Sequence, residues 1–241
     1  MIDWRDRALV LTRRPHGETS AIVDLFTRDH GRQAGLLRGG ISRKKTAWLQ
    51  PGTEVDAHWK ARLEGQLGTW TLEPLRSRGA ALANRLTLDG LAAVTALLAH
   101  ALAEGDPHPA FYDATAALLD LTDTPDLWPI AYLAWELTLL EDMGFGLDLS
   151  RCAVTGQAQD LIYVSPRTGR AISAAAAGDW APRLLPLPPA LRGVGHQRGP
   201  DIAQALGTTG WFLEHRLLPQ LSNRTMPAAR ARLIDTLARL D

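Results

Sequence analysis

The chain has 241 residues, of which 46% are hydrophobic, and its 26 basic residues balance its 26 acidic ones. This length is sufficient for one large domain or two small ones with a buried core. Because the net charge is zero, it predicts neither binding to nucleic acid nor binding to an acidic partner. Only the placement of the charges along the chain is informative.

That placement is uneven along the chain. Residues 1–80 contain 14 Lys and Arg against 9 Asp and Glu, whereas residues 81–241 contain 12 against 17. All three lysines lie in the first part. The asymmetry indicates two units, of which the first is the expected partner of a polyanion.

The cellular location is indicated by three features. Cys152 is the only cysteine, so no internal disulfide can form. The start, MIDWRDRALV, mixes charges of both signs where a signal peptide needs a basic start and an apolar run. The longest apolar uncharged run, GLAAVTALLAHALA, is shorter than the roughly 20 residues of a membrane-spanning helix. We therefore expect a cytoplasmic protein without a membrane segment.

The first 80 residues predict five short strands, each rich in β-branched, aromatic and apolar residues. They are expected at 7–14, 19–29, 31–38, 53–62 and 68–75. In the fourth, Val55, Ala57 and Trp59 alternate with polar residues, which is the period of a half-buried strand. Five strands in this length predict a small barrel, such as an OB-fold, over residues 1–80.

From residue 81 the hydrophobic residues follow helical spacing. Apolar stripes predict helices around 91–101, 111–121, 130–143, 210–221 and 227–240. Between them, near 144–175, the segments DLIYVS and GRAIS around the turn PRTG predict an irregular insertion with a short hairpin. The fold class is therefore α+β and multidomain, with a mainly α-helical second domain over 81–241.

The common enzyme motifs are missing. The chain contains no phosphate-binding loop, lipase elbow or HExxH motif, and none of its seven histidines is four residues from another. Glu141 and Asp142 are neighbours, but adjacent helical positions point about 100° apart and no base and nucleophile accompany them. We expect no enzymatic activity.

The segment LLRGGISRKKTAWLQPGT, residues 36–53, concentrates positive charge. Six cations and a single acid, Asp29, occur from Arg28 to Lys45. If the third strand ends near Arg38, the following residues form a flexible arm beside the barrel, with Trp48 nearby. A cationic groove with an aromatic surface suits single-stranded nucleic acid, whereas Trp4, Trp59 and Trp70 are expected in the core. The alternative is a solvated loop whose charges only keep it in water.

These features resemble the RecO family of bacterial DNA repair proteins. The resemblance rests on the five-strand start with LLRGGISRKKTAWLQPGTEV, then AWELTLLEDMGFGLDLSRCAVTG, YVSPRTGRAIS and GWFLEHRLLPQL. It covers nearly the whole chain. The most specific parts are the basic segment with LQPGT and the segment from Leu139 to Gly156.

The resemblance implies a non-enzymatic, DNA-binding recombination mediator associated with the nucleoid. Family members are similar in having an N-terminal OB-fold that binds single- and double-stranded DNA and a helical C-terminal domain. They anneal complementary strands, bind the C-terminal tail of the single-strand-binding protein, and act with RecR, in many species also RecF, to load RecA at gaps. Carried over to this sequence, DNA binding would fall on Arg38, Arg43, Lys44 and Lys45, with Arg32 and Arg14 as secondary candidates.

One departure from the family concerns zinc. Many RecO-like proteins have a four-cysteine zinc site that begins at the position of Cys152, with a second cysteine three residues on. Here that position is Thr155, and no later cysteine exists. A single thiolate cannot form a closed tetrahedral zinc site. We expect no zinc or other cofactor, and a buried Cys152 in a turn that the hairpin holds.

The sequence also allows other interpretations of the function. The barrel could bind RNA, because charge and stacking do not by themselves distinguish the sugars. The helical domain could contain a metabolic enzyme with an incidental basic loop beside it, although no set of catalytic groups predicts one. The pocket for the single-strand-binding-protein tail should be apolar with a cation at its edge, such as Arg151.

Overall fold

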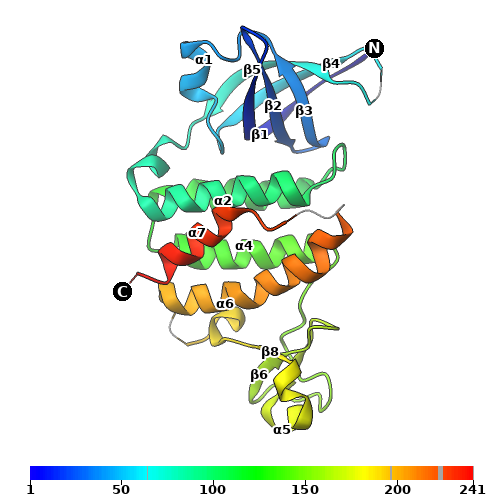
Figure 1. The fold of residues 1–241 in the computed structure, drawn as a ribbon, viewed down its shortest axis with the longest axis vertical. Helices are drawn as coiled ribbons and strands as arrows, with labels where there is room; N and C mark the ends of the chain where they lie inside the picture. The colour runs from blue at the N-terminus through cyan, green and yellow to red at the C-terminus, as the bar shows by residue number, and fades with distance from the viewer. Residues whose placement is uncertain (64, 196, 222–224, 241) are drawn as a thin grey trace. The chain divides into compact units, whose positions relative to one another are not determined.

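The structure is a computed structural model that describes residues 1–63, 65–195, 197–221 and 225–240. Contacts divide the chain into two compact units (Figure 1). The first comprises residues 1–125 and 227–230, and the second comprises residues 126–226 and 231–241.

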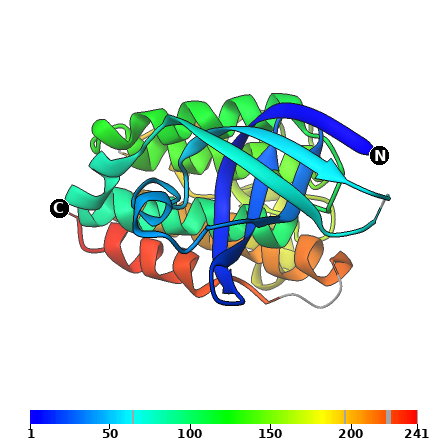
Figure 2. The same cartoon turned by 90° about the horizontal axis from the view of Figure 1, so that it is seen from above.

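Five strands of the first unit form a closed barrel. They are β1 (Ile2–His16), β2 (Ser20–Thr27), β3 (Gly31–Leu37), β4 (Glu54–Ala61) and β5 (Gly68–Arg76). The order is β1-β2-β3-β5-β4, and antiparallel pairing of β1 with β4 closes the barrel (Figure 2). Only β3 and β5 run parallel. This is the strand order of an OB-fold, so the predicted fold of the first domain is confirmed.

Tryptophans fill the barrel. Trp4 lies opposite Trp59 on β4, which lies opposite Trp70 on β5, and the ring centroids are 4.6 to 6.0 Å apart. Large rings require space, and a Cβ at Gly35 would lie 2.3 Å from the Trp59 ring, so only glycine fits there. Trp59 and Trp70 are buried, as predicted, whereas Trp4 is half-buried and stacks on His30.

The expectation of a flexible arm after β3 is wrong. Residues Arg43–Trp48 form the helix α1, and the Ser42 hydroxyl at its N-cap accepts a hydrogen bond from the Lys45 amide. Leu49, which follows α1, is buried in the barrel core, and Trp48 packs against that core. The segment is ordered because a side-chain cap starts the helix and two apolar residues at its end are held by the core.

Two longer helices complete the first unit. They are α2 (Arg85–Ala101) and α3 (Pro109–Asp120), with 3₁₀ turns at Gly79–Ala83 and Leu121–Asp123. The Asn84 side chain caps α2 by accepting from the amides of Leu86 and Thr87. The strand pattern ends at Arg76, near the expected boundary at residue 80, but α2 contacts β1. The compact unit therefore continues past the change from strand to helix.

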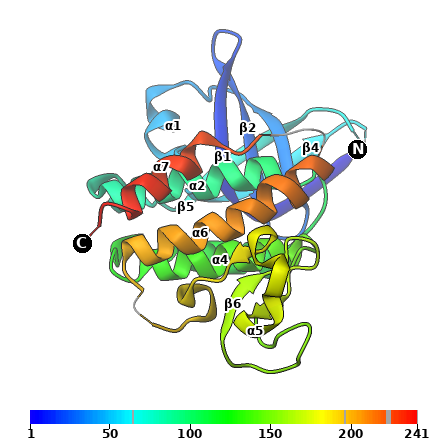
Figure 3. The same cartoon turned by 60° about the horizontal axis from the view of Figure 1, so that its bottom comes forward.

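The second unit is mainly helical (Figure 3). Its helices are α4 (Trp128–Asp142), α5 (Ala174–Ala177) and α6 (Gly199–Phe212), followed by a π-helical turn (Leu213–Leu217), with 3₁₀ turns at Gly178–Arg183, Pro189–Arg192 and Leu218–Gln220. The last helix, α7 (Ala228–Leu237), begins within the residues of the first unit and continues in those of the second. No described helix has both the length and the apolar character to span a membrane.

The predicted hairpin lies in this second unit. β6 (Leu161–Val164) pairs with β7 (Ala171–Ser173) around the PRTG turn, and β8 (Leu185–Pro186) adds a third strand on the other side of β6. β8 was not predicted, because two residues within a proline-rich run carry no strand period.

Candidate nucleic-acid interface

The 14 Lys and Arg residues of the first 80 positions divide into two equal groups. Seven have a carboxylate within 4 Å: Arg5, Arg7, Arg28, Arg32, Lys60, Arg76 and Arg78. For the other seven, no carboxylate of a described residue lies that close: Arg13, Arg14, Arg38, Arg43, Lys44, Lys45 and Arg62. We call these the paired and the unpaired cations.

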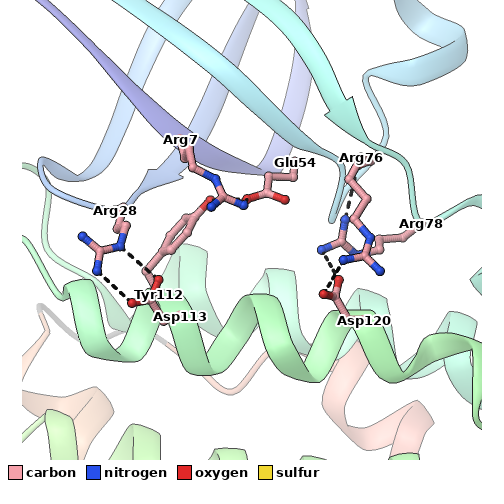
Figure 4. Close-up of polar contacts among 8 residues, drawn as sticks. All are labelled: Arg7, Arg28, Glu54, Arg76, Arg78, Tyr112, Asp113 and Asp120. Carbon is pink, nitrogen blue, oxygen red and sulfur yellow. Dashed lines mark hydrogen bonds and ion pairs between the residues drawn. The ribbon is translucent and has the colours of Figure 1, made fainter.

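Several paired cations hold the barrel against α3 (Figure 4). The Arg28 guanidinium donates to both carboxylate oxygens of Asp113, at 3.0 and 2.9 Å. This pairing lowers the pKa of Asp113 and raises the pKa of Arg28. Arg7 donates to Glu54 at 2.5 Å, and the Tyr112 hydroxyl donates to the same oxygen at 3.2 Å.

Asp120, at the end of α3, forms ion pairs with two of these cations. Arg76 and Arg78 lie 2.5 and 2.6 Å from its two oxygens (Figure 4). The side chain of Arg78 is only 3% exposed, and its burial lowers its pKa, an effect that the Asp120 charge opposes. These cations connect parts of the first unit, and their charge is already neutralised.

Arg32, a secondary candidate from the sequence, belongs to the paired group. Its guanidinium lies 2.8 Å from Asp24 and donates to the Leu102 carbonyl at 3.0 Å. The side chain is 15% exposed. Burial raises the pKa of Asp24, and the Arg32 charge opposes that rise. Arg32 therefore differs from the four primary candidates, because its charge is already paired with a carboxylate inside the first unit.

The four primary candidates are brought together at the β3–α1 connection. Arg38 directly follows β3, and Arg43, Lys44 and Lys45 form the first turn of α1. The Lys45 ammonium donates to the Arg38 carbonyl at 2.6 Å. We call these four residues the cationic cluster. Arg14 is exposed on β1, in the hairpin with β2, and is also unpaired.

A residue that the sequence analysis missed positions α1. The Arg13 guanidinium donates to the Thr46 hydroxyl at 2.7 Å and to the Gly40 carbonyl at 3.4 Å. It thereby ties the helix and the preceding turn to β1. No sequence signal connects Arg13 to Thr46, because the contact depends on how the chain folds back over the barrel.

A groove opens beside the cationic cluster. Its volume is ≈ 400 Å³, and it is lined by Leu37, Arg38, Lys45, Thr69, Trp70, Thr71 and Leu72. Of this lining, Leu37, Trp70 and Leu72 are buried, whereas Arg38 is exposed and Lys45 is half-buried. Trp48, which the sequence offered as a stacking surface, packs against the barrel core instead.

A second barrel cavity has a different character. It has a volume of ≈ 280 Å³ and includes the stacked rings of Trp4 and His30, 3.9 Å apart. The described residues of its lining include Asp29 but no Lys or Arg. The cavity therefore lacks the charge that a phosphate requires.

Cys152 in the second unit is buried, as predicted. Its sulfur accepts hydrogen bonds from the Ser173 amide and hydroxyl, at 3.3 and 3.5 Å. Burial raises the thiol pKa, but hydrogen bonds from Ser173 and Thr155 outweigh this effect and bring the pKa to about 6. The sulfur is thus surrounded by donors, and within the described parts of the chain no three potential metal ligands cluster. One thiol and two hydroxyls do not fit a tetrahedral zinc site.

The strand order, the helix between β3 and β4 and the cationic cluster define an OB-fold protein with a surface suited to nucleic acid. Two family models match the chain, "Recombination protein O N terminal" at residues 1–78 and "Recombination protein O C terminal" at residues 83–225.

Relatives named "DNA repair protein RecO" agree with these matches. The protein from Ruegeria sp. (strain TM1040) is 61% identical over 99% of both chains, and that from Roseobacter denitrificans is 53% identical over the same shares. The protein from Paracoccus denitrificans is 51% identical over 97% of this chain and 95% of its own. This chain belongs to the RecO family, and its role lies in DNA repair and recombination.

Proposed function

We propose that this protein is a recombination mediator without enzymatic turnover, and that the cationic cluster, with Arg14 as an outer contact, binds single- and double-stranded DNA. The observation that carries the proposal is the division of the barrel cations, because only the unpaired ones can neutralise phosphates without first breaking an ion pair. A cytoplasmic, nucleoid-associated location follows from a DNA partner.

Annealing of complementary strands follows from the same charges. Two approaching DNA strands repel each other, and cations that contact both reduce that repulsion. Membership of the RecO family supports the further steps of the proposal. In these further steps, the protein acts with RecR, and in many species also with RecF. Together they help load RecA onto single strands covered by the single-strand-binding protein.

Fluorescence anisotropy with labelled single-stranded DNA across a salt series tests the DNA site. In Arg43→Ala/Lys44→Ala/Lys45→Ala, three phosphate contacts are lost, so the slope of log K against log salt should become shallower by about 2. Lys60→Ala, which removes a paired cation, is the control. An unchanged slope and affinity in the triple variant would refute the site, and preferred binding of a matched RNA would indicate a different substrate.

We also propose that the acidic, apolar tail of the single-strand-binding protein binds a pocket of the second unit. This pocket of ≈ 110 Å³ is lined by two aromatic rings, Phe145 and Phe212, and by two cations, Arg167 and Arg216. Arg151, the candidate from the sequence, does not line it and donates instead to the Gly156 carbonyl at 3.4 Å. Arg216→Glu should abolish binding of a labelled tail peptide, while Arg151→Glu should not.

Finally, we propose that the protein contains no zinc and needs no cofactor. The hydrogen bonds to the Cys152 sulfur support this, because Ser173 and Thr155 take the place that metal would have around the thiol. Metal analysis of the purified protein should find less than stoichiometric zinc. Stoichiometric zinc that resists mild chelation would contradict the proposal.

A further inference from the structure

The groove beside the cationic cluster exists because β3 and β5 separate. They pair over only three residues, Gly35–Leu37 with Gly68–Trp70. β3 then ends and the chain turns toward α1, whereas β5 continues to Arg76 alongside β4. Beyond Trp70, one edge of β5 therefore borders the groove without a described strand partner.

That edge offers hydrogen-bonding groups. Thr71, Leu72 and Glu73 pair with β4 on one side only. Along a strand, backbone N–H and C=O groups point alternately to the two sides, so part of this set points toward the groove. Thr69 and Thr71 are exposed and line the groove, with the Thr69 hydroxyl donating to the Lys60 carbonyl at 3.4 Å, and Arg38 in the same lining adds a planar guanidinium. These groups suit a planar ligand with polar edges. The backbone groups and hydroxyls can form hydrogen bonds with its edge, and a guanidinium stacks on flat rings.

We propose that this groove receives an unpaired base of the bound DNA strand and so makes the interface prefer single strands over duplex. The inference rests on the proposed DNA-binding function. The cationic cluster meets phosphates in either form of DNA, but only an unpaired base can turn into a groove next to them. The volume of ≈ 400 Å³ lies within the range of about 300–1,000 Å³ typical of small-molecule sites. Backbone and hydroxyl groups accept any base, so no sequence preference is expected.

Thr71→Phe tests the groove by filling it. Thr71 is exposed, and phenylalanine is favourable in strands, so the fold should be retained. Because the loss of one base contact costs about 1–3 kcal/mol, the affinity for single-stranded DNA should fall by about 5- to 150-fold. The affinity for a duplex of equal length should change by less than about twofold, since the groove is not used there. Thr12→Phe, at an exposed strand threonine outside the groove lining, is the matched control.

An oligonucleotide with abasic sites provides a second measurement on the unaltered protein. It retains the phosphates but lacks the bases, so the unaltered protein should bind it more weakly than the intact strand, and Thr71→Phe should bind both equally. Equal losses for single strands and duplex in Thr71→Phe, or equal binding of abasic and intact strands by the unaltered protein, would refute the groove proposal. Failure of the DNA site itself would appear separately, as an unchanged salt slope in the triple charge variant.

Discussion

The two groups of barrel cations have the same chemistry but different surroundings. Most of the paired cations meet carboxylates that are distant in sequence, as in Arg28 with Asp113, 85 residues away, and Arg76 with Asp120, 44 residues away. The cationic cluster instead lies in the stretch from His30 to Thr53, which contains no Asp or Glu at all. The difference shows that the number of cations in a segment does not measure its available charge, because folding neutralises some cations and leaves others free.

The largest expected effect concerns the paired group. Asp120→Ala leaves the buried Arg78 without its counter-charge, so we expect the free energy of unfolding to fall by about 2–3 kcal/mol, less than for a fully buried pair because Asp120 is partly exposed. Chemical denaturation followed by tryptophan fluorescence measures this. Asp123→Ala, which removes an exposed carboxylate three residues later, is the control. Equal stability of the two variants would show that the Arg78 pair is not required.

A second prediction concerns the hydrogen bond that positions the cationic cluster. Thr46→Val removes the acceptor for Arg13 without changing charge or shape appreciably. Loss of about 1 kcal/mol should weaken DNA binding about fivefold, while Thr46→Ser should bind normally. In Arg13→Gln/Thr46→Val the loss should be no greater than in Arg13→Gln alone, because that variant already lacks the hydrogen bond to Thr46. If Arg13 instead contacts phosphate directly, Thr46→Val will leave the affinity for DNA unchanged.

A third prediction compares single members of the two groups by the salt dependence of binding. Arg43→Gln should make the slope shallower by about 0.7 on single-stranded DNA, because one phosphate contact is lost. Arg28→Gln should leave the slope unchanged, because Asp113 already neutralises that charge. Equal changes in the two variants would remove the distinction between the groups.

The smallest effect is a pH dependence of stability. Arg28 holds the pKa of Asp113 below its ordinary value of 3.8, so this pair stabilises the folded state above that value and the contribution is lost as the pH falls through the lowered pKa. The stability difference between the unaltered protein and Asp113→Asn should therefore shrink below about pH 4. Denaturation midpoints at pH 7 and pH 3 test this. A difference that persists at pH 3 would assign the effect to packing.

Much of the barrel could be predicted because its signals are local. Alternating apolar residues placed all five strands, and the same alternation placed Trp59 and Trp70 in the core. The helix α1 was missed because six residues are too few for a helical stripe, and its apolar end, Trp48 and Leu49, is held by the core rather than by neighbours in the helix.

The sequence by itself determined the family, the change from a strand-rich first part to a helical second part, and the location of the excess positive charge, since each depends on residues close together along the chain. Only the tertiary structure decided which cations remain free, that Arg13 holds Thr46, and that β3 and β5 part to form a groove. The physical reason is that ion pairs, hydrogen bonds and strand edges depend on separations in space, and folding brings together groups far apart in sequence, such as Arg28 and Asp113, 85 residues apart. Among the six candidate DNA-binding residues, Arg32 shows this, because its guanidinium donates to the carbonyl of Leu102, 70 residues away, and is also paired with Asp24.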